Sequence, residues 1–210
     1  MSKPPLKQRQ VSKKSDTFSS IPQALKAGGV GVVPTDTIYG LVASALLPST
    51  VKRLFKLRRP PAQAGKTPNK PFIVLISDTK ELASFGVYPT ASQKNILKKI
   101  WPGEVSVIFP VFGKQFGYLH RGTNALAFRL PAKKSLRELL GKTGPLLAPS
   151  ANLEGEKPAE TVIEAKKYFG DKADFYVNAG KRLAGKPSTL VMFENDTLKV
   201  LRAGAVKIEI

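Results

Sequence analysis

The sequence contains no cysteine and only one histidine, His120, among its 210 residues. These absences exclude disulfides, zinc sites built on thiolates, cysteine nucleophiles and metal sites with several histidines. A serine-histidine-aspartate triad would have to use His120. That residue stands beside Arg121 in a loop-like stretch that offers no orienting carboxylate. We therefore do not expect His120 to be catalytic.

Acidic residues are also scarce. The chain has 15 Asp and Glu against 34 Lys and Arg, which gives a formal net charge of +19. Such an excess indicates a polyanionic partner or substrate, with nucleotide and nucleic acid as the first candidates. No apolar run approaches the roughly 18 residues that span a bilayer, and no apolar segment follows the basic N-terminus as it would in a signal peptide. We expect a cytoplasmic protein without membrane association.

The length and the 42% hydrophobic content fit one domain with one sizeable core. Residues 1–17 are polar and basic, so we predict a flexible tail there and a folded domain over residues 18–210. The charge of the tail serves either solubility or the attraction of RNA. The sequence shows no internal repeat.

Helical and strand patterns alternate along the domain. Helices are predicted from Ser19 to Gly28, after Pro48 with Ser49 as its cap, and over 79–85, 90–100, 133–140 and 158–169. Strands are predicted over 30–33, 72–76, 105–111, 125–130, 145–148, 188–193 and 198–202. Because the strands are apolar on both faces and alternate with helices, the pattern predicts an α/β fold with a largely covered sheet.

Polar residues follow several of these strands, where open α/β sheets place their ligand crevices. Such stretches are Pro34–Leu41, Pro149–Asn152, Lys186–Leu190 and Val200–Gly204. A run of cations also lies between residues 51 and 70 with no acid among them, which suits a triphosphate or simply a solvated helix face. None of these segments matches a Walker loop or a dinucleotide fingerprint.

The order of the motifs resembles that of the YrdC/TsaC family over about residues 20–205. The motifs that carry the resemblance are PTDTIYGL at 34–41, NKPFIV at 69–74, WPG at 101–103, LAFRL at 126–130, APSAN at 148–152, PSTL at 187–190 and LRAG at 201–204. The resemblance implies a single domain with a twisted, open, mixed sheet and helices packed on it. It also implies a threonylcarbamoyl-AMP synthase, which uses L-threonine, bicarbonate and ATP for the t6A modification at position 37 of tRNA.

Site residues follow from the same resemblance. It implies that Thr35 and Arg129 bind threonine. For ATP it implies the basic segment with Lys56, Arg58 and Arg59, followed by Ser106, Ser150, Asn152, Ser188, Thr189 and Arg202. The family usually carries Lys-x-Arg after the basic helix, but an ungapped count from Pro34 puts Arg58 at the lysine and Pro60 at the arginine. Either Arg58 and Arg59 serve with a shifted register, or Lys56 and Arg58 keep the spacing.

The chemistry that the resemblance implies needs no side-chain nucleophile. A carbamate of threonine attacks the α-phosphorus of ATP, and positioning and cations stabilise the transition state. Mg²⁺ is expected on the phosphates rather than in a protein cage, and tRNA or double-stranded RNA and the t6A transfer machinery are the expected macromolecular partners. Two alternatives remain open, a YciO-like paralogue with a different activity and an RNA-binding protein without catalysis.

Overall fold

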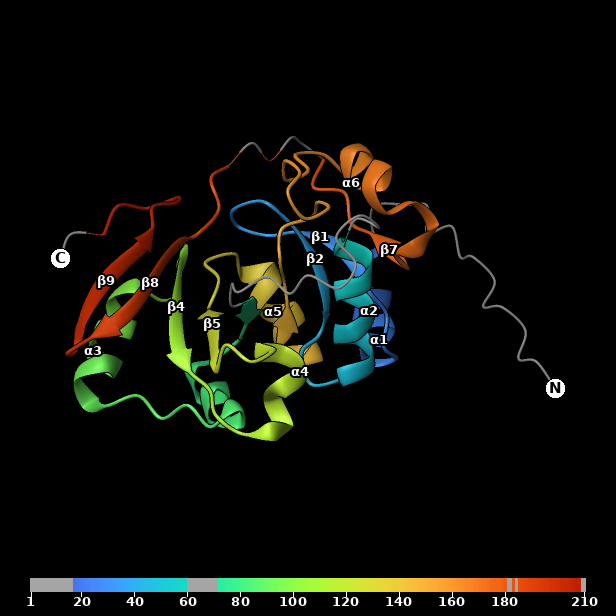
Figure 1. Cartoon of the computed structure of the whole chain (residues 1–210). Coiled ribbons are helices and arrows are strands. Elements are labelled where there is room, and N and C mark those ends of the chain that lie inside the picture. Colours follow the sequence, from blue (N-terminus) through green and yellow to red (C-terminus); the bar gives the residue numbers. More distant parts are fainter. Residues whose placement is uncertain (1–16, 60–71, 181–182, 184, 209–210) are drawn as a thin grey trace.

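The computed structural model describes residues 17–59, 72–180, 183 and 185–208, and Figure 1 shows the course of the chain. All of the expected tail except Thr17 lies outside the described residues, and Thr17 is the first residue of helix α1. Pro60, Lys66 and Lys70 of the basic segment also lie outside them.

The chain alternates between helices and strands. The helices are α1 (Thr17–Lys26), α2 (Pro48–Arg58), α3 (Ala91–Ile100), α4 (Gly117–His120), α5 (Lys134–Thr143) and α6 (Val162–Phe169), and 3₁₀ turns cover Thr79–Phe85, Lys114–Phe116 and Gly170–Lys172. The strands are β1 (Gly31–Pro34), β2 (Tyr39–Ser44), β3 (Ile73–Leu75), β4 (Val105–Pro110), β5 (Ala125–Arg129), β6 (Leu146–Leu147), β7 (Phe175–Tyr176), β8 (Thr189–Glu194) and β9 (Thr197–Arg202). Within the described residues, no helix combines the length and the apolar character that a bilayer crossing requires.

The strands form one sheet in the order β7-β1-β2-β6-β3-β5-β4-β8-β9. The pairs β1–β7, β3–β5 and β4–β8 are parallel, and the other pairs are antiparallel. The predicted α/β class with a mixed sheet is therefore confirmed. Strand β2 was not predicted, because it begins inside the polar motif at 34–41, yet all six of its residues are buried.

Helices cover both faces of the sheet. On one face, α1 and α5 lie side by side and contribute Ile21, Leu25, Leu136 and Leu140 to a buried apolar cluster. On the other face, a larger cluster includes side chains from α2, α3 and α6. Burial of these apolar faces is the main force that holds the helices on the sheet. The turn between β1 and β2, the end of β5, the loop after β6 and the segments at the start of β8 and the end of β9 are left to form the site.

Several predicted boundaries need correction. Ser49 is not the cap of α2, because the helix begins at Pro48 and Leu47 occupies the cap position without a side-chain bond. Proline suits the first helical position, since its missing N–H has no partner there in any case. The helix expected over 158–169 begins only at Val162, with Thr161 as its cap, and the strand expected over 145–148 pairs only at Leu146 and Leu147.

Candidate active site

The turn between β1 and β2 forms one wall of the candidate site, and the hydroxyl of Thr35 shapes it. Thr35 Oγ1 accepts hydrogen bonds from the backbone N–H groups of Thr37 and Ile38, both at 3.2 Å, and donates to the carbonyl of Ile38. Threonine favours such local bonds in turns because its short side chain can reach the nearby backbone. The predicted threonine-binding residue Thr35 therefore holds its own loop in shape while it lines the site.

Arg129 reaches this turn from the end of β5. Its Nη1 donates to Thr37 Oγ1 at 3.1 Å, and its Nη2 lies 3.1 Å from Asp36 Oδ1 in an ion pair whose side chains are 4% and 6% exposed. Burial lowers the pKa of Arg129, and the charge of Asp36 opposes that shift. Arg129 Nε is buried and has no hydrogen-bond partner among the described residues. Arg129 also lines the cavity, so its guanidinium places a positive charge where an anionic ligand could bind.

The loop after β6 forms the second wall. Its backbone is tied to β2, since Leu41 N donates to Pro149 O and Ala151 N donates to Tyr39 O, both at 2.9 Å. The side chain of Arg58, at the end of α2, holds the loop from the other side. Its Nε donates to Asn152 O at 3.3 Å and its Nη2 to Ser150 Oγ at 3.4 Å. Burial lowers the pKa of Arg58, and the charge of Glu154 opposes this effect.

Asn152 is part of this loop but directs its amide to the backbone. Its Nδ2 donates to Leu153 O at 2.6 Å and to Glu156 O at 2.8 Å, while Oδ1 is buried without a partner among the described residues. These bonds fix the path of the loop after Ser150. Asn152 therefore shapes the wall from behind rather than lining the cavity.

The third wall comes from the start of β8 and the end of β9. Ser188 Oγ lies 2.8 Å from Ser106 Oγ of β4, and both side chains are buried. Arg202 Nη2 donates to Ser188 O at 2.7 Å, and burial lowers the pKa of this arginine. Thr189 exchanges hydrogen bonds with the backbone of Val206 and so anchors the segment after β9.

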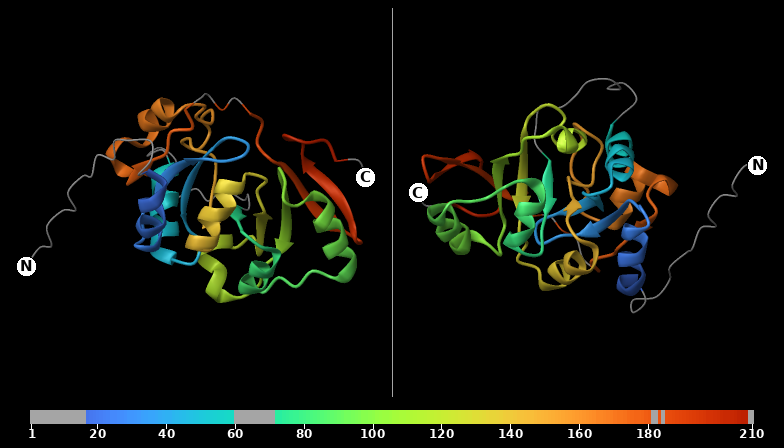
Figure 2. Two further views of the ribbon diagram at one scale, coloured as in Figure 1. Left: turned by 180° about the vertical axis from the view of Figure 1, so that it is seen from behind. Right: turned by 90° about the horizontal axis from the view of Figure 1, so that it is seen from below.

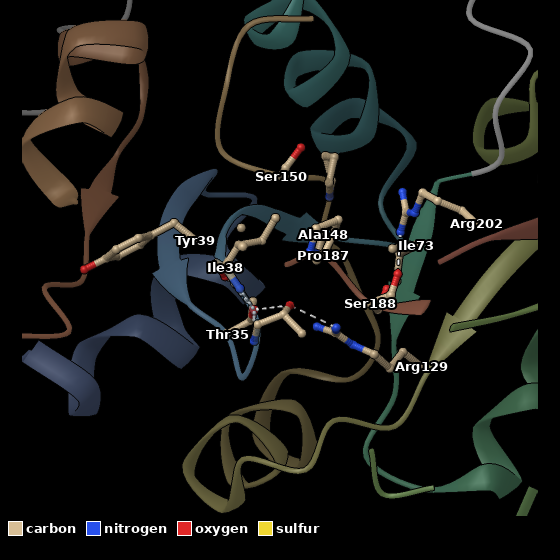
Figure 3. Close-up of a pocket in the computed structure, with 13 residues that line it drawn as sticks. Thr35, Ile38, Tyr39, Ile73, Arg129, Ala148, Ser150, Pro187, Ser188 and Arg202 are labelled. Carbon is tan, nitrogen blue, oxygen red and sulfur yellow. Dashed lines mark hydrogen bonds between the residues drawn. The ribbon is translucent and has the colours of Figure 1, made fainter. Parts of the chain in front are cut away.

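These walls surround an open pocket with a volume of about 70 Å³, which is shown in Figure 3. Five of the predicted site residues line it, namely Thr35, Arg129, Ser150, Ser188 and Arg202. They come from positions up to 167 residues apart in the sequence (202 − 35). The fold therefore gathers two arginines and several hydroxyl groups around one space, an arrangement that can hold a small anionic ligand.

The other predicted residues do not line the cavity. Ser106, Asn152 and Thr189 support it from behind, and Arg58 supports the loop that carries Ser150. Lys56 is exposed on α2 and Arg59 is half-buried just after this helix. Arg53, from the same basic run, pairs instead with Asp174, so part of that run has a structural role.

Sequence reasoning missed the roles of several neighbours. Asp36 and Thr37 lie in the quoted motif, but only their contacts with Arg129 show that they position this arginine. Tyr39 is fully buried, and its hydroxyl accepts a hydrogen bond from Ala179 N at 3.0 Å, which fastens the segment before the third wall. No local signal could have found these contacts, because the partners are distant in sequence.

Comparison with known proteins places the chain in a family. The model of the Sua5/YciO/YrdC domain, described as telomere recombination, matches residues 23–204. A relative from Idiomarina loihiensis, named threonylcarbamoyl-AMP synthase, is 28% identical over 180 residues, which are 84% of this chain and 93% of that protein.

Two solved structures share the fold. Pyrococcus abyssi Sua5 complexed with L-threonine has a TM-score of 0.78 at 24% identity, and the match covers 89% of this chain but 54% of that one. E. coli YciO has a TM-score of 0.75 at 23% identity, with 90% of each chain covered. The chain thus spans about half the length of the Sua5 protein and nearly the full length of YciO. With most of its length matched by the family model, this chain belongs to the Sua5/YciO/YrdC family.

Proposed function

We propose that this protein is a threonylcarbamoyl-AMP synthase, which makes threonylcarbamoyl-AMP and pyrophosphate from L-threonine, bicarbonate and ATP for the t6A modification of tRNA. The observation that carries the proposal is the single cavity on which Arg129, Arg202 and the hydroxyl groups of Thr35, Ser150 and Ser188 converge. Relatives with this name, which cover most of this chain, support it. The reaction makes the protein a nucleotidyltransferase.

The proposed reaction joins two anions. The amine of threonine adds to carbon dioxide from bicarbonate and loses a proton, which gives a carbamate. A carbamate oxygen then attacks the α-phosphorus of ATP, the bond from this phosphorus to the bridging oxygen breaks, and pyrophosphate leaves. The enzyme must hold like charges together and neutralise the charge that develops on the leaving group, so positioning and cations supply the catalysis.

The cavity offers groups for each part of this task. Arg129 lines the cavity next to Thr35, where its positive charge is placed to bind the carboxylate of threonine. Arg202 and the hydroxyl groups of Ser150 and Ser188 lie on the other walls, where they are placed to contact the nucleotide. Mg²⁺ enters in this proposal as part of the substrate, bound to the phosphates of ATP.

The test is the incorporation of labelled bicarbonate into an adenylate by the purified protein with ATP and Mg²⁺. We expect product with L-threonine, much less with L-serine and none without an amino acid. Release of pyrophosphate should match adenylate formation one to one. ATP binding without any adenylate in the presence of threonine would refute the proposal.

A YciO-like activity is the second candidate, because E. coli YciO matches this chain along 90% of both lengths. The same assay separates the two, since a paralogue of different activity would bind ATP but form no threonine-dependent adenylate. For the macromolecular partners, we propose tRNA and the proteins that transfer the threonylcarbamoyl group to it. The net charge of +19 supports an affinity for RNA, and that affinity should fall steeply with salt.

A further inference from the structure

Strand β9 lies at one end of the sheet and pairs with β8 on one side only. Among the residues that the structure describes, no strand pairs with its outer edge, which Figure 1 shows at the margin of the molecule. The strand has six residues, whereas β7 at the opposite end of the sheet has two. An open edge of this length is a template on which a further strand can pair.

The geometry of the β8–β9 hairpin shows which backbone groups of β9 point outward. The hairpin has a two-residue turn at 195–196, with left-handed backbone at both positions (φ of 49° and 59°). Such a turn is closed by a hydrogen-bonded pair of residues, here Glu194 and Thr197, and bonded and unbonded pairs then alternate along the antiparallel ladder. Leu198 and Val200 therefore belong to unbonded pairs. Their backbone N–H and C=O groups point away from β8, toward the open edge.

Apolar side chains accompany these backbone groups. Val200 is 36% exposed and Leu201 is 46% exposed, although proteins usually protect an edge strand with charges, proline or a covering segment. The protection that β9 carries is Lys199, whose ammonium group pairs with Glu194 at 2.8 Å, and a shift of register near Arg202. The middle of the strand thus combines unpaired backbone groups with exposed apolar surface.

The surroundings of this edge are positively charged. Helix α3 lies beside the hairpin in both Figure 1 and Figure 2, and Thr90 Oγ1 at its start donates to Asp196 Oδ1 in the hairpin turn at 3.4 Å. The helix contains no acidic residue. Helix α3 and the hairpin together carry more cations, namely Lys94, Lys98, Lys99, Lys199 and Arg202, than acids, namely Glu194 and Asp196. A segment that docks on β9 therefore gains from negative charge.

We propose that the outer edge of β9 binds an extended, acidic segment of a partner protein as an additional strand. In this mode, backbone hydrogen bonds to Leu198 and Val200 give affinity, and the side chains of the segment give specificity. Its carboxylates face the cations of α3 and the hairpin. Because Arg202 ends β9 and also lines the cavity, the bound partner lies beside the candidate active site. The inference goes beyond the proposed function and does not depend on it.

Charge also decides between the possible occupants of the edge. A second copy of this chain brings its own net charge of +19 to an already basic surface. Residues 1–16 of the chain contain five cations and one acid. Like charges oppose the docking of both, whereas an acidic segment is attracted. RNA would also be attracted, but it lacks the peptide groups that pair with a sheet edge.

The experiment is an NMR titration of the isotope-labelled full chain that follows hydrogen exchange and chemical shifts of the Leu198 and Val200 amides. The probe is a synthetic peptide of alternating valine and glutamate, about eight residues long, which is enough to span β9. One control peptide has lysine in place of glutamate, and another is N-methylated throughout. We expect the acidic peptide to slow exchange at both amides, and both control peptides to bind about tenfold more weakly or less.

Variants of the chain test the same contacts from the other side. Val200→Pro removes the outward N–H at a position where an edge strand tolerates proline, and Val200→Ala is its matched control because it keeps the N–H. We expect Val200→Pro to weaken binding of the acidic peptide about tenfold and Val200→Ala less than about threefold. Lys98→Glu on α3 should weaken binding about threefold, whereas Lys142→Glu, at an exposed position of α5, should change it little.

The outcomes decide the inference without any measurement of catalysis. Slowed exchange at Leu198 and Val200, with the expected order of peptides and variants, supports it even if the protein makes no adenylate. Equal binding of the acidic and lysine peptides, or no change at these two amides, overturns it. Slow exchange before any peptide is added also overturns it, because the edge would already be covered by a second copy or by another part of this chain. Changes at these amides with duplex RNA but not with peptide would overturn it and assign the surface to RNA. If Val200→Pro does not fold, the N-methylated peptide and Lys98→Glu carry the test.

Discussion

Replacing Asp36 with asparagine would leave the Arg129 guanidinium charged and buried without its counter-ion. The two side chains are 4% and 6% exposed, and the atoms that pair lie 3.1 Å apart. Loss of one partner of such a buried pair costs about 3–5 kcal/mol of the free energy of unfolding. Because small domains have only about 5–15 kcal/mol in total, the Asp36→Asn variant should be much less stable than the wild type.

Urea unfolding at pH 7 measures this effect in Asp36→Asn, in Arg129→Gln and in the double variant. The double variant buries no charge, so its loss should be smaller than the sum of the two single losses by more than about 1 kcal/mol. Asp174→Asn is the matched control, since it breaks a pair with Arg53 in which both side chains are 39% exposed, and it should cost about 1 kcal/mol or less. If Asp36→Asn costs no more than this control and the double variant shows no coupling, the buried-pair reasoning is wrong.

Three further predictions concern the loops and the pH dependence of stability. Arg58→Ala should raise the KM for ATP about tenfold with little change in the KM for threonine, because Ser150 and Asn152 lose the hydrogen bonds that Arg58 donates to them. An equal change in both KM values, measured by steady-state kinetics, would contradict this role. Thr35→Ala should cost about 1–3 kcal/mol of stability and raise the KM for threonine, whereas Thr35→Ser, which keeps the hydroxyl, should stay near the wild type in urea unfolding and kinetics. Burial raises the pKa of Asp174, but the Arg53 hydrogen bond, the Val30 N–H and the charge of Arg53 outweigh it and lower the pKa overall. The carboxylate therefore stabilises the fold above its ordinary pKa of about 3.9 and loses this effect as the pH falls through the lower folded value, so the stability difference from Asp174→Asn should shrink below about pH 4 in thermal unfolding scans. A difference that stays constant from pH 7 to pH 3 would show that the charge is not its cause.

Local sequence patterns predicted most of the regular structure because they depend on contacts between near neighbours. The apolar run before Pro34 became β1, and the Gly28-Gly29 pair follows the end of α1. Strand β2 was missed because its first residues belong to a polar motif, and its burial comes from pairing with β1 and β6. The cap of α2 was wrong because Pro48 could start the helix without a side-chain cap.

The sequence by itself determined the α/β class, the family and the segments that carry the site. The hydrophobic periodicity and the order of the motifs can both be read directly from the linear sequence. It could not decide which motif residues face the cavity. Ser150 and Asn152 are two residues apart, yet only Ser150 lines the space, while Asn152 bonds to the backbone behind it. Arg58 and Arg121 show the same limit more strongly, because the partner of each is supplied by a distant segment. The direction of a buried polar side chain is set by the donors, acceptors and rings that the tertiary structure brings to it, so only the fold could assign Arg58 to the loop and place Arg121 beside Phe55.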